Sequence, residues 1–363
     1  MTAVSRHRFP GSWFMRRSSQ LCGIGSQDAP SLFRSIQTCP SLLLLLFCIG
    51  LGCVGGLRVA AAEDTRIWFG MGALTSPAGR HSWELLYYQE KPDWPDALKK
   101  VTVMGVLTQA LVKIPEAELT QFAARLREKN IGLGVEMLAQ AYTPPGCGGG
   151  VEGYFPPDQT AALAAKVRRA NGTVQYVAMD EPVWFGHYYN GPQACHSSIN
   201  NVAERVAANL REYLKVFPDL AIGDIEPIPS MSSQPNWRAD YSAFRAAVQK
   251  ATGKPIAYLF VDIDWARPDW EQGLKAVVQY AQDTRLPLGI IYNASPPAAS
   301  KDNQAWLNEA RRNFAHIERD LRIKPQWAMF TSWTKFPGHA VTDANGLGED
   351  YLVKEYLKGV GSR

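Results

Sequence analysis

Beyond residue 65, hydrophobic and polar positions repeat one pattern eight times. A short run rich in β-branched and aromatic residues is followed by a longer segment with helical periodicity. Successive runs start 30 to 47 residues apart, which leaves room for a strand, a crossover helix and two loops. The pattern predicts an α/β fold, a single-domain (β/α)8 TIM barrel. The predicted strands begin near Ile67, Val101, Ile131, Val174, Ala221, Ile256, Leu288 and Gln326.

The lengths of the connections indicate which end of the barrel is functional. Those that lead from a helix to the next strand are short, whereas the loops after the third and fourth strands, residues 139–157 and 182–198, are long. TIM barrels carry their sites on the loops that follow strands, so these loops are expected to line the site. Helices are predicted over residues 115–129, 158–171, 199–217, 238–252, 268–283 and 302–321.

The N-terminal segment has a different character. An apolar run at residues 41–57 follows a basic, acid-poor stretch and precedes Ala60-Ala61-Ala62, which is typical of a secretory signal peptide. The run is shorter than the roughly 20 residues of a spanning helix. We therefore expect a leader at residues 1–62, a catalytic barrel at 63–363, no stable membrane span in the mature chain, and a periplasmic or secreted location. The alternative is a retained N-terminal anchor.

Charge and cysteine content change this picture in two ways. Of the net charge of +4, the leader contributes +5, and residues 63–363 hold 32 basic and 33 acidic side chains. This balance argues against a nucleic-acid partner. Outside the leader only Cys147 and Cys195 remain, and a pair of cysteines in an oxidising compartment predicts a disulfide. Two independent thiols are the alternative.

Acidic residues gather at the predicted strand ends. Side chains alternate along a strand, and the side that faces the helices is expected to be apolar. Leu259, Val261 and Ile263 then face outward, which turns Asp262 and Asp264 toward the barrel axis. The same argument turns Glu136, Asp180, Asp224 and Glu226 inward and places Glu181 at the rim. The candidate catalytic acids are Glu181, Asp262, Glu226, Asp180 and Asp264, with Glu136 as a substrate-binding acid.

Crowded carboxyl groups repel one another, which separates their pKa values and keeps both an acid and a base available near neutral pH. Aromatic rings beside polar groups suit a sugar ring, and many of the tryptophans flank these acids. Trp68 and Trp327 are also expected on this face. The further candidates for substrate binding are Trp184, His187, Tyr188, Trp265, Tyr292, Asn293 and Trp333.

Two short motifs resemble a known group of enzymes. Met179-Asp180-Glu181-Pro182 ends the fourth predicted strand and Ser332-Trp333 ends the eighth, which resembles the secreted TIM-barrel glycoside hydrolases of clan A, where strand four ends in Asn-Glu-Pro. The resemblance implies that Glu181 is the general acid/base, that the Trp333 ring forms the floor of the sugar site, and that the partner is a carbohydrate.

The chain departs from the clan pattern at strand seven, where the clan has a Glu nucleophile and this sequence reads Ile291-Tyr292-Asn293. The second carboxyl then has to come from Glu226, Asp262 or Asp264. Acids from strands four and six are paired in barrels that resemble α-galactosidases.

Other readings remain open. A secreted barrel that binds carbohydrate without cleaving it is the main alternative, and a Mg²⁺-dependent enzyme with acids at strand ends is a weaker one. The paired histidines of zinc hydrolases are missing from strand one, and no cofactor or metal is predicted. The sequence leaves the sugar, the linkage, the stereochemical outcome and the oligomeric state open.

Overall fold

The computed structural model describes residues 65–70, 82–83, 86–87, 94–142, 146–341 and 347–359. The chain divides into Met1–Arg58 and Val59–Arg363, and every described residue belongs to the second unit. The leader and its cleavage point lie outside the described residues, so both stay predictions. Within the described ranges, no helix is long and apolar enough to cross a membrane.

Eight parallel strands close into a barrel in the order β1, β10, β9, β8, β7, β6, β3, β2. Each of the eight predicted strands is found, which confirms the (β/α)8 fold. The barrel strands are β1 (Arg66–Gly70), β2 (Val103–Leu107), β3 (Gly132–Met137), β6 (Val174–Asp180), β7 (Ala221–Ile228), β8 (Ile256–Ile263), β9 (Leu288–Tyr292) and β10 (Trp327–Phe330). A separate parallel pair is formed by β4 (Gln140–Ala141) and β5 (Tyr154–Phe155).

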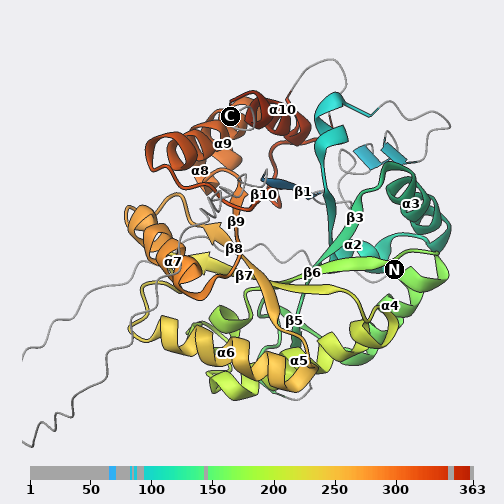
Figure 1. The fold of residues 1–363 in the computed structure, drawn as a ribbon, viewed down its shortest axis with the longest axis vertical. Coiled ribbons are helices and arrows are strands. Elements are labelled where there is room, and N and C mark those ends of the chain that lie inside the picture. Colours follow the sequence, from blue (N-terminus) through green and yellow to red (C-terminus); the bar gives the residue numbers. More distant parts are fainter. Residues whose placement is uncertain are drawn as a thin grey trace, which may run out of the picture. The chain divides into compact units, whose positions relative to one another are not determined.

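Helices surround the barrel strands, and Figure 1 shows α3 to α7, α9 and α10 outside the ring. The α-helices are α2 (Thr108–Lys113), α3 (Glu116–Lys129), α4 (Pro157–Arg169), α5 (Ile199–Val216), α6 (Trp237–Thr252), α7 (Trp270–Thr284), α8 (Pro296–Ala299), α9 (Asn303–Ala315) and α10 (Glu349–Gly359). Single turns of other helix types are η2 (Asp96–Lys100), η3 (Trp184–Tyr188) and η4 (His316–Asp320). The predicted helices are confirmed to within two residues, except that the last one divides into α9 and η4.

The barrel interior is filled by aromatic rings. Trp68, Tyr258, Phe260 and Trp327 belong to one buried cluster inside the strands, and the Trp68 ring lies 5.6 Å from that of Phe260. Glycine is needed where these rings approach a neighbouring strand, since a Cβ at Gly223 would collide with the Tyr258 ring. Trp68 and Trp327 therefore pack the interior, and the expectation that they line the functional face is wrong.

The alternation argument holds for three of the four acidic strands. In β3 and β8 the residues Leu133, Val135, Leu259 and Val261 join the outer core beneath the helices, as predicted. In β6, Ala178 belongs to the interior cluster, which turns Asp180, two residues later, to the same side.

In β7 the prediction is wrong. Ile225 belongs to the interior cluster, whereas Ile222 and Ile228 join the outer core, so Asp224 and Glu226 face the helices. Both acids are fully buried there. The rule that the helix-facing side must be apolar fails because a buried carboxylate is tolerated where backbone N–H groups bind it.

Candidate active site

Four acidic side chains meet at the barrel mouth, the end at which the parallel strands finish. Glu136 follows Gly134, which packs against the Trp68 ring inside the barrel. Asp180 ends β6, Glu181 follows it directly, and Asp262 lies two residues beyond the interior residue Phe260 of β8. The structure therefore brings together four of the acids that the sequence singles out.

A fifth acid, Glu152, joins them from the long loop after β3. Charge repulsion from Glu152 acts on Glu136, Asp180, Glu181 and Asp262. Sequence reasoning missed this residue because it lies in a glycine-rich loop, where no strand alternation assigns a direction to a side chain. The available signal was its place between Cys147 and the strand of the Asp-Glu-Pro motif. We call these five residues the acid cluster.

Burial and mutual repulsion raise the pKa values throughout the acid cluster. Burial raises the pKa of Glu136 to about 8, and the carboxyls of Asp262 and Glu152 add to the rise. The pKa of Asp262 is raised to about 7, mainly by burial and next by the Glu152 charge. The pKa values of Asp180 and Glu181 are raised well above the usual range by the same causes. The site therefore holds protonated and ionised carboxyls together near neutral pH.

Asp262 is at the electrostatic centre of the cluster. It is the charged neighbour that acts most strongly on both Glu136 and Glu181. No Lys or Arg of the described residues is among the groups that shift the pKa values of these five acids. In the same part of the chain, no group of three or more His, Cys, Asp or Glu side chains could hold a metal ion.

The backbone around Glu181 is tightly held. Glu181 has a left-handed conformation with φ of 47°, which is uncommon for a residue other than glycine. Its N–H donates to the carbonyl of Ile225 at 3.1 Å. The buried Glu226 carboxylate accepts from the N–H groups of Val183 at 2.8 Å and Trp184 at 3.1 Å. Glu226 therefore caps the turn that carries Glu181, and its predicted place in the barrel mouth is not found.

A cavity of about 180 Å³ adjoins Asp262. Trp265 forms part of its lining and donates from Nε1 to Oδ1 of Asn293 at 2.5 Å. Asn293 also forms a side-chain hydrogen bond with Asp262, which acts to lower the pKa of that carboxyl. Trp333, which is 45% exposed, contributes another part of the lining. Asn293 stands at the position where clan A has its Glu. It thus holds both the Asp262 carboxyl and the Trp265 ring by hydrogen bonds.

The remaining candidates are engaged in other hydrogen bonds. His187 and Tyr188 follow Trp184 in η3, but the Tyr188 hydroxyl donates to Asp240 of α6 at 2.5 Å, and His187 Nδ1 lies 2.7 Å from the Ser197 carbonyl. Tyr188 is therefore held to α6, and His187 to the loop that follows β6. Asp264 lines the cavity but is exposed, and its carboxylate accepts from the Ala266 N–H at 3.2 Å.

Tyr292 does not line the functional face, and that expectation is wrong. It is fully buried in the outer core, and its hydroxyl donates to Glu318 of η4 at 2.7 Å. The sequence placed it on the functional face because it ends a strand. Its alternation with the interior residue Ile291 directs it to the helix layer instead.

The predicted disulfide is confirmed. Cys147 and Cys195 are bonded, with their Cα atoms 5.0 Å apart. The bond joins the loop after β3 to the loop after β6. Arg205 of α5 lies against it, with guanidinium nitrogens 3.7 Å from the Cys195 sulfur and 3.8 Å from the Cys147 sulfur.

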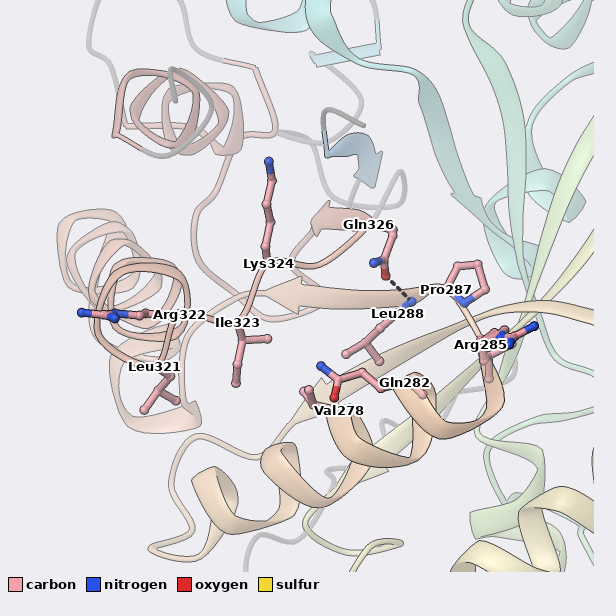
Figure 2. A pocket seen from close by; sticks show the side chains of 12 residues that line it. Val278, Gln282, Arg285, Pro287, Leu288, Leu321, Arg322, Ile323, Lys324 and Gln326 are labelled. Carbon is pink, nitrogen blue, oxygen red and sulfur yellow. Dashed lines mark hydrogen bonds between the residues drawn. The ribbon is translucent and has the colours of Figure 1, made fainter. Parts of the chain in front are cut away.

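A cavity of about 480 Å³ lies at the opposite end of the barrel, where β9 and β10 begin. Figure 2 shows that Arg285, Arg322 and Lys324 extend away from one another there, and that Gln326 accepts from the Leu288 N–H at 2.8 Å. Because the cations do not converge, this cavity does not form an anion site. The strand-start end of a TIM barrel generally contributes to stability.

Comparisons with known proteins add little about activity. No protein-family model and no curated protein matches the chain. One similar solved structure is a GH10 protein from Paenibacillus barcinonensis, with 12% identity over 82% of this chain and 96% of the other and a TM-score of 0.47. Another is a β-glucosidase from Thermotoga maritima, with 11% identity over 83% of this chain and 99% of the other and a TM-score of 0.44. Pyruvate carboxylase from Rhizobium etli is also similar (12%, 82% and 26%, 0.40). Likeness at this level carries no argument about function.

Proposed function

We propose that this chain is a glycoside hydrolase or transglycosidase that acts on an oligo- or polysaccharide with two carboxyl groups. The observation that carries the proposal is the action of the Asp262 charge on the buried Glu181 at the barrel mouth, where Asp262 adjoins a cavity lined by Trp265 and Trp333. The two acids come from the ends of the fourth and sixth barrel strands.

The different pKa values suit different roles. Glu181, whose pKa burial and the Asp262 charge raise well above its usual range, keeps its proton near neutral pH and donates it to the glycosidic oxygen as that bond breaks. Asp262, with a pKa of about 7, is partly ionised and either attacks the anomeric carbon or removes a proton from an attacking water. Asn293 orients this carboxylate. Which of the two reactions occurs follows from the carboxyl separation, about 5 Å for retention and about 6.5 to 9.5 Å for inversion.

The surroundings of the two acids fit a sugar. Trp265 and Trp333 offer apolar ring faces at the cavity, while Glu136 and Asp180 can accept hydrogen bonds from hydroxyl groups. We place the enzyme outside the cytoplasm on the strength of the predicted leader and the Cys147–Cys195 disulfide.

Substitution of the proposed acid tests this function. Glu181→Gln is expected to lower kcat by at least about 100-fold on unactivated glycosides, because general acid catalysis typically contributes about 10² to 10⁴. Glu204→Gln, on an exposed position of α5, serves as the matched control and should retain full activity. Thermal unfolding would verify that both variants fold. Full activity of Glu181→Gln would overturn the assignment.

A carbohydrate-binding barrel without catalysis is the second candidate. The observation that favours it is the amide of Asn293 at the strand-seven position. Titration calorimetry alongside a reducing-end assay on a polysaccharide panel separates the two: saturable binding with no new reducing ends would favour the binding protein.

A further inference from the structure

The loop that carries Glu152 is built to hold one position. Its two ends pair as β4 and β5, and the Gln140 N–H donates to the Gly153 carbonyl at 2.8 Å. Asn209 of α5 is fully buried and donates to the carbonyls of Ala139 at 3.0 Å and Phe155 at 2.9 Å. Both ends of the loop are thus hydrogen-bonded to α5.

The tip of the loop is fixed to the neighbouring loop. The Cys147–Cys195 bond joins the two, and the Gly148 N–H donates to the Gln193 carbonyl at 2.8 Å. Gly153 has a φ of 82°, and a Cβ there would lie 2.8 Å from the Asp180 carbonyl oxygen. The backbone next to Glu152 therefore packs directly on the end of β6, above the barrel mouth.

Glu152 differs from the other four acids in its environment. Glu152 is exposed to solvent, although the atoms around it raise its pKa by partial burial. The titratable groups that face it are Glu136 from β3, Asp180 and Glu181 from the end of β6, and Asp262 from β8. On the outer side of the loop, the Arg205 guanidinium lies on the disulfide sulfurs.

We propose that Glu152 is a fifth residue of the active site. The loop closed by the disulfide holds Glu152 over the barrel mouth. Its role is to place a negative charge beside the four acids beneath it. The inference rests on the proposed function for its catalytic meaning. The link from Cys147–Cys195 to Glu152 to Asp262 does not depend on that function. Without the bond, the Gly148–Gln193 hydrogen bond is the remaining link described between the two loops, and we expect the Glu152 charge to move away from the four acids.

A double-mutant cycle tests the proposal in the full barrel. Its four proteins are the wild type, Glu152→Gln, Cys147→Ser/Cys195→Ser and the combination of all three substitutions, and Glu204→Gln is the charge-matched control. Carboxyl NMR titration reports the pKa values of Glu136 and Asp262 without any substrate. Glu152→Gln is expected to lower both pKa values by about half a unit or more, because it removes a nearby negative charge.

Removal of the disulfide should produce a similar downward shift in the wild type and almost none when Gln already occupies position 152. The acid limb of the kcat/KM profile should move with the Asp262 titration. Unchanged titrations in Glu152→Gln, or shifts that simply add in the combined variant, would overturn the proposal. If the serine variant does not fold, Gly153→Ala displaces the same loop segment and is expected to give the same non-additive shift. Titration shifts in a protein that cleaves no glycoside would reject the proposed function and keep this inference.

Discussion

Glu226 offers the sharpest test of how the fold positions the proposed acid. Its carboxylate is fully buried and binds two successive N–H groups, those of Val183 and Trp184, with one oxygen each. Glu226→Gln keeps the size of the side chain but replaces one acceptor oxygen with an NH₂ group. Two donors then face each other, and one hydrogen bond to a charged group is lost.

The size of the effect follows from that lost bond. A hydrogen bond to a charged group contributes about 1.5 to 3 kcal/mol, so the free energy of unfolding should fall by about 2 kcal/mol. This is a sizeable part of a typical total of about 5 to 15 kcal/mol. A displacement of Glu181 by about 1 Å can lower the rate about 100-fold. We therefore expect kcat to fall by about 10- to 100-fold, with a smaller change in KM.

Urea unfolding and steady-state kinetics at pH 7 measure both quantities. Asp224→Asn is the matched control, because Asp224 lies on the same face of β7 and is equally buried. Within the described residues its carboxylate oxygens have no hydrogen-bond partner, and burial raises its pKa. This control should retain stability and kcat. A Glu226→Gln protein with wild-type stability and wild-type kcat would refute the capping role.

Two pH dependences follow from the acid cluster. Since Asp262 must be ionised and Glu181 protonated, kcat/KM should rise through a pKa of about 7 and fall only at higher pH; a bell-shaped profile centred near pH 5 would contradict the assigned roles. The folded state binds more protons than the unfolded state wherever carboxyl pKa values are raised, so stability should be greatest below about pH 4.5 for these groups and decline as pH rises toward 8. Urea unfolding at pH 5, 7 and 8.5 measures this decline, and equal stability at the three values would show that the cluster is ionised without cost.

The sequence alone determined the barrel, because eight strand and helix periods with short return connections admit few other arrangements. It also identified four acids of the cluster, because alternation in β3, β6 and β8 turns Glu136, Asp180 and Asp262 toward the barrel axis and Glu181 follows Asp180 at the rim. The disulfide was predictable from the two cysteines that lie beyond the predicted leader.

Only the tertiary structure decided the directions of Asp224, Glu226 and Tyr292. Glu226 faces outward because the N–H groups of the Glu181 turn receive its carboxylate, and these groups are not contained in a one-strand pattern. Glu152 was hidden for a related reason: a loop side chain takes its place from distant contacts, here a disulfide and the end of β6. Local periodicity encodes which face of a strand is buried, whereas partners far away in the chain determine what a buried acid binds.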